Sequence, residues 1–571
     1  MAFHKVHCPR CGRIMYADEL AFDFGEILNV ALEKAKNRTF GKNEEWYDLT
    51  QLNLCLYLTL DDLKKEYGFS QVPDGTYEGN FTFTTSHLAK QLVRLADSTN
   101  PNMSVDILAS GTDMVEYEKL TKAMAKSSDV DIQRLASKIQ ELAVRIQRNK
   151  DAVIAVSHVK VNMQKDDQGN SFANRLTVKF DDGEINNITN FLCKGEPGNP
   201  CGKILYGHAG QYKEIIIGLA GTARVGKTAY LAALLACILR EGNGIEKLGH
   251  DQRVVTNLAY TDKAYEQFKH DLLEPYTNCT KIAKTPYIFD KVGDTEAISL
   301  FSLTFSINRK KYIFTFIDMP GEVFDDEDKG ADIVSNNRQI IKDASAIWLC
   351  IAPAQVAGEA VIAGGTQVNN DLGKAFANLS KTMAAIGVQI PTATLITCSD
   401  LIEEKYDLFH SEFNPFGSSD NPMHYLNEKT NDVNTPWVSE SGDLYYSNML
   451  WFIQNSFKYL SSGQGQKLPE SIESIFGSFT PFAVASYGKE INNPFAVEED
   501  NTIPKPSMIE GPFLWTLAEL GIIPAYKEKE IEWEETTGWG PFKKTVTYRE
   551  VRNVRLKEEE LKELLYYPAG L

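Results

Sequence analysis

Short apolar runs alternate with helical patterns through the middle of the chain. The runs have the length of strands, and the segments between them carry apolar residues at the steps of three and four that mark one face of a helix. Strands that are joined by helices lie parallel in one sheet, so this order predicts an α/β fold with a mostly parallel sheet covered by helices. The runs expected to form strands are KEIIIGLA, AISLFSLTF, KYIFTFID, AIWLCIAP, TATLITCS and FAVASYG.

The pattern changes on both sides of this central region and divides the chain into residues 1–212, 213–525 and 526–571. In the first region, TLDDLKKEYG predicts a helix that Thr59 caps and Gly68 ends. The segment NRLTVKFDDGEINNITNFLC alternates between apolar and polar residues and predicts a hairpin that turns at Asp-Asp-Gly.

Further helices are expected at 117–150, within TPWVSESGDLYYSNMLWFIQNSFKYL, and at GPFLWTLAELGI, which would close the central domain. The linker within the chain is expected at 497–508. The last region predicts a hairpin that turns near Gly538–Gly540, followed by a short helix, LKEEELKELLYY.

One strand, EIIIGLA, leads into the glycine loop GTARVGKT, and a long helical pattern follows the loop. Gly221, Gly226, Lys227 and Thr228 fit the pattern GxxxxGK[ST], whose glycines let backbone N–H groups turn toward phosphates. Lys227 would reach the β- and γ-phosphates, and the Thr228 hydroxyl would bind Mg²⁺. The alternative is an ordinary glycine-containing turn between a strand and a helix.

A carboxylate at the end of a neighbouring strand would complete the magnesium site, and KKYIFTFIDMPGE supplies one. Asp318 ends this apolar run and would hold Mg²⁺ through a water molecule, while Gly321 would offer its backbone N–H to the γ-phosphate. The alternative for this motif is a plain turn after a strand.

The order of these motifs resembles that of the P-loop GTPases of the TRAFAC class. A third motif, LITCSD, aligns with the N/T-K-x-D motif of the family at Thr397 and Asp400, and a fourth, FAVASYGK, matches its base-side loop at Ala485 and Ser486. The resemblance covers 213–525 and implies a P-loop NTPase that binds GTP and Mg²⁺, in which Asp400 accepts hydrogen bonds from guanine. The loop residues expected to hold the phosphates are Gly221, Thr222, Ala223, Arg224, Val225, Gly226, Lys227 and Thr228.

Two residues depart from the family pattern. Cys398 replaces the lysine whose stem covers the base, which keeps an ATPase open as an alternative. Glu322 follows DxxG where small Ras-like GTPases place a glutamine that orients water, so slow turnover or dependence on an activator is expected. The catalytic set implied is Lys227, Glu322 and a switch threonine, either Thr280 or, by preference, Thr285. Arg224 would contact phosphate or face solvent.

The DMPGE form, the large insertions and the segment PFLWTL resemble the large bacterial GTPase-like NTPases more than small GTPases. Some members of that group, including the double-GTPase-like proteins, are assigned to bacterial conflict systems. This resemblance implies a nucleotide-dependent conformational switch in defence, and a scaffold with little turnover is the alternative of another class.

Two cysteine pairs bracket the first region. Cys8 and Cys11 lie in HCPRCG, which resembles a zinc-ribbon knuckle, and Cys193 and Cys201 lie in CKGEPGNPCGK. Four thiolates would close a tetrahedral structural zinc site with the intervening residues inserted between its halves. The alternatives are a redox pair and a site that uses His4 or His7 as a ligand.

Composition and charge limit the classes of molecule that the chain is expected to bind. The chain has 571 residues and a formal net charge of −18 at pH 7, which disfavours nucleic acid and anionic lipid. We expect no membrane span and no signal peptide, because the apolar runs are short or interrupted. Nine cysteines then indicate a reducing, cytoplasmic compartment, and the N-terminal region is expected to bind a protein partner.

Overall fold

A computed structural model describes this chain over separate stretches. The chain divides into two compact units, and the boundary between them lies between Glu214 and Ile215. The described residues are 3–8, 13–25, 27, 30, 57–84, 153–181, 183, 185–188, 191–195, 205, 208–222, 224–239, 245–248, 252–257, 269–278, 299–307, 310–318, 342–358, 361–363, 366–368, 390–399, 402, 444–462, 468–487, 508–537 and 544–555.

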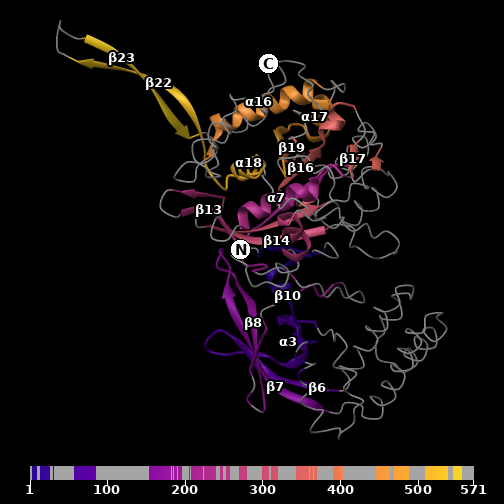
Figure 1. The fold of residues 1–571 in the computed structure, drawn as a ribbon. Helices are drawn as coiled ribbons and strands as arrows, with labels where there is room; N and C mark the ends of the chain where they lie inside the picture. Colours follow the sequence, from indigo (N-terminus) through magenta and orange to yellow (C-terminus); the bar gives the residue numbers. More distant parts are fainter. Residues whose placement is uncertain are drawn as a thin grey trace. The chain divides into compact units, whose positions relative to one another are not determined.

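The second unit is built on an eight-stranded sheet of order β12-β13-β14-β15-β11-β16-β19-β21 (Figure 1). Strands β11, β16, β19 and β21 pair in parallel, as the alternation of strands and helices predicts. The strands are β11 (Glu214–Ala220), β12 (Ile245–Leu248), β13 (Gln252–Asn257), β14 (Ser299–Ile307), β15 (Lys310–Asp318), β16 (Ala346–Ile351), β19 (Thr392–Ile396) and β21 (Thr480–Ala483).

The expectation of a mostly parallel sheet is wrong for the other half. Strands β12 to β15 are antiparallel to their neighbours in turn. Only residues 308–309 separate β14 from β15, and so short a connection permits a hairpin but no helical crossover. The alternation of strands and helices therefore describes β11, β16, β19 and β21 and fails for β12 to β15.

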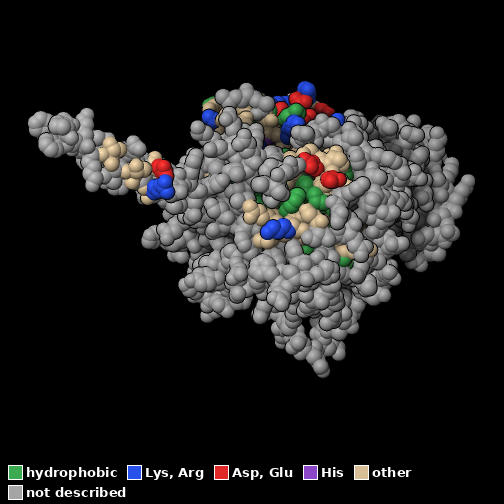
Figure 2. Space-filling model, turned by 90° about the horizontal axis from the view of Figure 1, so that it is seen from above, with side chains coloured by type: hydrophobic (Ala, Val, Ile, Leu, Met, Phe, Trp, Pro, Cys, Tyr) green, Lys and Arg blue, Asp and Glu red, His purple; other side chains and the backbone are tan. Residues whose placement is uncertain are grey.

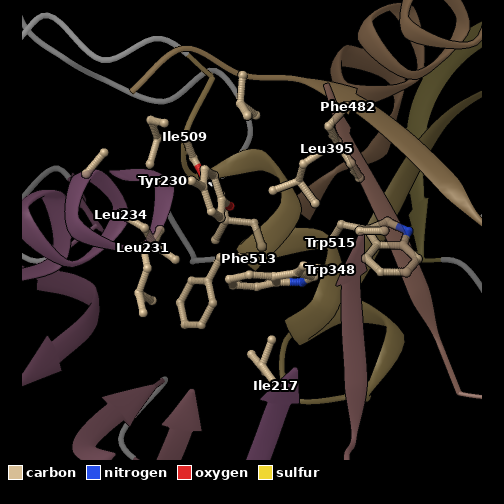
Figure 3. Packing of buried hydrophobic residues seen from close by; sticks show 14 of the residues in the cluster. Ile217, Tyr230, Leu231, Leu234, Trp348, Leu395, Phe482, Ile509, Phe513 and Trp515 are labelled. Carbon is tan, nitrogen blue, oxygen red and sulfur yellow. Dashed lines mark hydrogen bonds between the residues drawn. The ribbon is translucent and has the colours of Figure 1, made fainter. Parts of the chain in front are cut away.

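The core of the second unit packs helices against the parallel strands. The indole of Trp348 on β16 makes edge contacts with Tyr230 and Phe513 (Figure 3). Its N–H donates to Thr516 Oγ1 at 3.0 Å. The expected helices are confirmed in the first helix after the glycine loop, in the inserted segment and at the end of the domain. These three are α7 (Lys227–Leu239), α16 (Tyr446–Ser462) and α18 (Gly511–Glu519). The unit also contains α12 (Pro353–Val356), α17 (Leu468–Phe476), the π-helix η4 (Lys269–Leu273) and α9 (Glu274–Thr277).

The predicted C-terminal hairpin is confirmed. Strand β22 (Ala525–Thr537) pairs antiparallel with β23 (Lys544–Arg555), and β22 also pairs with β20 (Leu444–Tyr445). Glu532 and Arg549 form an exposed ion pair at 2.5 Å across this hairpin, and acidic and basic side chains lie next to each other on it (Figure 2). A separate two-stranded sheet joins β17 (Val361–Ala363) and β18 (Thr366–Val368).

The first unit contains a five-stranded antiparallel sheet of order β5-β6-β7-β8-β9. The hairpin predicted at Asp-Asp-Gly is confirmed between β8 and β9, whereas the long strand β7 is not anticipated by the sequence pattern. The strands of this unit are β1 (Lys5–His7), β2 (Ile14–Tyr16), β3 (Ala21–Asp23), β4 (Tyr57–Thr59), β5 (Ser70–Gln71), β6 (Tyr77–Thr84), β7 (Val153–Lys165), β8 (Ser171–Phe180), β9 (Ile185–Ile188) and β10 (Phe191–Leu192).

The helix α3 (Leu60–Tyr67) forms as its capping residues predict. The Thr59 hydroxyl accepts from the Asp62 N–H at 3.1 Å, and the Thr59 N–H donates to the Asp62 carboxylate at 2.7 Å. Gly68 ends the helix with a φ of 71°, a left-handed conformation that glycine adopts without strain. A single 3₁₀ turn, η1 (Ala17–Glu19), lies in the same unit.

Several expected segments lie outside the described residues. They are the helix at 117–150, the linker at 497–508 apart from its last residue, the turn near Gly538–Gly540 and the C-terminal helix. Within the part of the chain that the structure describes, no helix combines the length and the apolar character that crossing a bilayer requires.

Candidate functional site

The sheet reverses its order at β11. After β11 and α7, the chain runs to β12 at the edge of the sheet and returns through β13 and β14 to β15, which lies beside β11. It then continues to β16 on the other side of β11. In such sheets, ligands bind in the crevice outside the carboxyl end of the strands at the point of reversal. The glycine loop, 221–228, occupies this point between β11 and α7.

The loop has a backbone that requires glycine at its first position. Gly221 has a φ of 140°, and a Cβ atom there would lie 2.4 Å from the carbonyl oxygen of Cys350 on β16. Gly226 also has a positive φ, of 85°, and Arg224, with a φ of 65°, is exposed. Glycine is therefore required at position 221 because of this close approach, and it is favoured at position 226 because of the positive φ.

Lys227 lies inside the curve of the loop. Its side chain is 7% exposed, and its ammonium donates to the carbonyl oxygens of Gly221 and Thr222 at 2.8 Å each. A buried ammonium is stable only when such oxygens surround it. The loop thus holds a positive charge at its centre, where an anionic group would be attracted.

Side chains from neighbouring strands fix the outside of the loop. The Thr397 hydroxyl, just after β19, donates to the Val225 carbonyl. The amide of Gln355, on α12 after β16, donates to the Thr222 hydroxyl at 2.8 Å and accepts from the Ala352 N–H at 3.0 Å. Sequence reasoning missed Gln355, for which the available signal is a polar residue within the apolar segment that follows a buried strand.

A hydroxyl and a carboxylate meet at the start of α7. Thr228 Oγ1 donates to Asp318 Oδ2 at 2.7 Å, and Asp318, the last residue of β15, is fully buried. The structure therefore brings together the two residues predicted for magnesium. Hard cations such as Mg²⁺ prefer oxygen ligands of this kind, so the donor set fits the ion.

A buried thiol lies close to this cluster. Burial raises the pKa of Cys350 to about 12, although the nearby ammonium of Lys227 acts in the opposite direction. The thiol is therefore neutral at physiological pH, and the thiolate needed for nucleophilic chemistry is absent there. Cys350 belongs to the core, as its position in an apolar run predicts.

The third and fourth motifs are adjacent at the same edge of the sheet. The Ser399 N–H donates to the Val484 carbonyl at 3.0 Å, and the Val484 N–H donates to the Ile396 carbonyl at 2.9 Å. Between them, Cys398 takes a positive φ of 54°, and its sulfur lies 3.7 Å from where a Cβ atom on Gly226 would be. The turn at Cys398 therefore lies between the loop with Ala485 and Ser486 on one side and the phosphate loop at Gly226 on the other.

The remaining predicted residues of this site lie outside the described residues. They are Ala223 of the loop, Thr280 and Thr285 of the first switch, Gly321 and Glu322 after the DxxG aspartate, and Asp400 of the base motif.

One cysteine of each pair is described, and each lies directly after a short strand of the first unit, Cys8 after β1 and Cys193 after β10. Cys8 and Cys193 are buried thiols. The Cys8 N–H donates to the Arg13 carbonyl at 2.9 Å and closes the turn between β1 and β2. The Arg13 guanidinium donates to the Gly195 carbonyl, which joins this turn to the stretch after Cys193.

The other cysteines of the proposed site, Cys11 and Cys201, lie outside the described residues. Among the residues that are described, no group of three or more His, Cys, Asp and Glu side chains is arranged to hold a metal ion. His7 Nδ1 lies 2.7 Å from the Glu214 carboxylate, and the His4 ring contacts the Asp167 carboxylate. Both histidines weighed as alternative ligands are therefore engaged with carboxylates.

Comparisons with known proteins give similarities among solved structures alone. No protein-family model matches the chain, and no curated protein matches it. Among solved structures, the crystal structure of a septin GTPase domain from Chlamydomonas reinhardtii is similar at 15% sequence identity, with a TM-score of 0.18. The similarity covers 49% of this chain and 76% of that chain.

Proposed function

We propose that residues 213–525 form a P-loop nucleoside triphosphatase that binds and hydrolyses GTP and acts as a conformational switch. The carrying observation is the glycine loop at the point of strand reversal, with Lys227 enclosed by loop carbonyls and Thr228 bonded to Asp318. A loop of this form, at the start of a helix, is suited to a polyphosphate because its backbone N–H groups and the helix terminus favour anions.

Each residue of the loop has a role in this proposal. The backbone from Gly221 to Thr228 wraps the phosphates, Lys227 neutralises their charge, and Thr228 and Asp318 hold Mg²⁺. The bound ion supplies further positive charge against the negative charge that develops in phosphoryl transfer. Thr285, Gly321 and Glu322 would act on the γ-phosphate and the attacking water, and we propose slow turnover because Glu322 is anionic.

We propose guanine as the base, read by Asp400 beside Thr397 and Ser486. The adjacency of the turn after β19 and the loop after β21 supports this placement. An ATPase that uses the same loop stays the alternative because Cys398 replaces the lysine of the family motif. A scaffold that binds nucleotide tightly with little turnover is the alternative of another class.

One set of measurements separates these proposals. Binding and multiple-turnover phosphate release are measured with GTP and with ATP for the wild-type chain, Lys227→Ala and Asp400→Asn. We expect GTP binding with slow release, loss of binding in Lys227→Ala and loss of GTP binding in Asp400→Asn. Equal affinity for ATP and GTP refutes guanine selection, and binding without phosphate release favours the scaffold. If neither nucleotide binds, the proposal fails altogether.

We further propose a structural zinc site formed by Cys8, Cys11, Cys193 and Cys201. The burial of two of these thiols and the Arg13 contact between their turns support it. Zinc measured by mass spectrometry in the purified chain is expected to fall in Cys8→Ser and Cys193→Ser. The matched control is Cys237→Ser, on α7, which keeps the metal. A wild-type chain that copurifies with no zinc refutes the site.

We propose a cytoplasmic bacterial protein of a conflict system, in which residues 1–212 bind a protein partner and residues 526–571 extend the switch domain. The resemblance of DMPGE and PFLWTL to large bacterial GTPase-like NTPases supports it. The expected test is that a partner captured by residues of the first unit binds the GTP state and the GDP state with different affinity.

A further inference from the structure

The helix α9 carries a tyrosine whose hydroxyl forms a hydrogen bond with the backbone of the loop after β21. Tyr276 is 3% exposed, and its hydroxyl donates to the carbonyl oxygen of Ser486 at 2.6 Å. Its ring also packs against Tyr487, with ring centroids 5.1 Å apart. One side chain therefore holds both the backbone and the following side chain of this loop.

The position of Tyr276 is itself fixed by the core. Helix α9 continues directly from the π-helix η4, whose Leu272 and Leu273 are buried in the same hydrophobic cluster as residues of α7. Within α9, the Thr277 hydroxyl donates to the Leu273 carbonyl at 2.8 Å. A π-helical turn adds a residue to the helix and redirects the side chains that follow, and such turns are frequent at functional sites.

The bond to Ser486 sets the direction of the next amide. In a trans peptide, the C=O and N–H groups point in opposite directions across a rigid plane. With the Ser486 carbonyl held toward Tyr276, the N–H of Tyr487 is held away from it. The tyrosine hydroxyl thereby determines the orientation of a backbone donor in this loop.

The loop lies on the side of the site where the base of a nucleotide would extend. The contact between Thr228 and Asp318 places the magnesium end of the phosphates toward β15. A base attached to the other end of the phosphate chain would extend toward β19 and β21. On that side, hydrogen bonds connect the phosphate loop to Thr397 and the turn at Ser399 to Val484.

We propose that Tyr276 is a positioning residue for base recognition, because its hydroxyl holds the peptide between Ser486 and Tyr487 in the orientation that faces the base. This inference rests on the proposed nucleotide site. A neutral hydrogen bond of this kind contributes enough to change affinity by roughly 3- to 10-fold. The change concerns ligands that carry a base and leaves ligands without a base unaffected.

The test compares GTP with inorganic tripolyphosphate, which has the phosphates and no base. Dissociation constants for both are measured by calorimetry, with Mg²⁺ and the full chain, for the wild type and Tyr276→Phe. The matched control is Tyr230→Phe, which also removes a buried hydroxyl that donates to a backbone carbonyl, that of Ile509 at 3.0 Å. Both variants lose one oxygen atom, and the proposal assigns a role in base recognition to Tyr276 alone.

We expect Tyr276→Phe to weaken GTP binding roughly 3- to 10-fold with tripolyphosphate binding unchanged, and Tyr230→Phe to leave the ratio of the two constants unchanged. Equal weakening of both ligands, or no weakening, overturns the inference. If Tyr276→Phe does not fold, Tyr487→Leu removes the facing ring and keeps the hydrogen bond to Ser486. The ratio of the two constants is then expected to stay at its wild-type value, and a selective loss of GTP binding overturns the inference. A wild-type chain that binds neither ligand refutes the proposed function instead.

Discussion

The Thr397 hydroxyl supports the phosphate loop from outside, and removing it tests how the loop keeps its shape. Thr397 is fully buried. Its Oγ1 donates to the Val225 carbonyl and also lies 3.3 Å from the Ile351 carbonyl. A hydroxyl has one proton, and the Ile351 carbonyl already accepts from the Thr397 N–H at 3.0 Å. The substitution Thr397→Val therefore removes the donor mainly from Val225.

The size of the expected loss of stability follows from the burial of Val225, whose carbonyl would lose its donor. A buried acceptor that loses its donor costs about 1–3 kcal/mol of stability, whereas the exchange of a hydroxyl for a methyl group changes little in volume. Thr394 provides a matched control, since it is fully buried on β19, the strand that Thr397 directly follows. The structure offers its hydroxyl no hydrogen-bond partner among the described residues. Thr394→Val is therefore expected to be neutral or stabilising.

The assay is urea unfolding of the nucleotide-free chain, followed by the fluorescence of buried tryptophans such as Trp348 and Trp515. Thr397→Val is expected to unfold at a lower urea concentration than Thr394→Val, with free energies that differ by about 1–3 kcal/mol. Equal stability of the two variants would show that the Thr397 hydroxyl does not support the loop. Nucleotide binding plays no part in this measurement, so it tests the geometry alone.

Three other outcomes are expected. Gly221→Ala should destabilise the chain by ~2 kcal/mol or more, because its Cβ would lie 2.4 Å from a carbonyl oxygen. Gly521→Ala, with a φ of 65° and no atom within 4 Å, should cost about 1 kcal/mol in the same urea unfolding assay; equal losses would contradict the steric argument. Burial raises the pKa of Asp62, but its hydrogen bonds, first that with Lys194, outweigh burial and hold the pKa below the ordinary 3.8. Its ionised form therefore stabilises the fold above about pH 4 and this contribution is lost as the pH falls further, whereas acid unfolding of Asp62→Asn should lack this component. The Cys350 thiol, with its pKa raised to about 12 by burial, should resist iodoacetamide at pH 8 until urea unfolds the chain, and rapid alkylation of the native chain, located by mass spectrometry, would contradict its burial.

Local signals in the sequence identify the features whose partners lie close along the chain. Thr59 caps a helix through Asp62, three residues later, and Gly68 ends it. The glycine loop is recognised in the same way, because strand, loop and helix are consecutive. Each of these predictions concerns contacts that are made within a few residues, where spacing alone determines which groups can meet.

Features that depend on distant pairing escape this reasoning. Strand β7 pairs with β6, whose Tyr77 lies opposite Val161, and its sequence, VIAVSHVKVNMQK, does not specify that partner. The antiparallel half of the large sheet was missed because a run of apolar residues indicates a buried strand without fixing its direction. The register and the orientation of such strands are set by their neighbours, which the pattern of one segment does not contain.

The candidate site combines both kinds of information. Its motifs are recognised in the sequence. The contacts that connect these motifs come from residues outside them, or from motif residues whose side chains were predicted to have another role. Gln355 fixes Thr222, and Thr397, predicted to lie beside the base, donates its hydroxyl to the phosphate loop at Val225. The turn that would read the base and the loop that would hold the phosphates therefore share one hydrogen bond. A shift of the turn at Thr397 moves the donor that fixes Val225, so base recognition and phosphate binding are expected to be coupled through this residue.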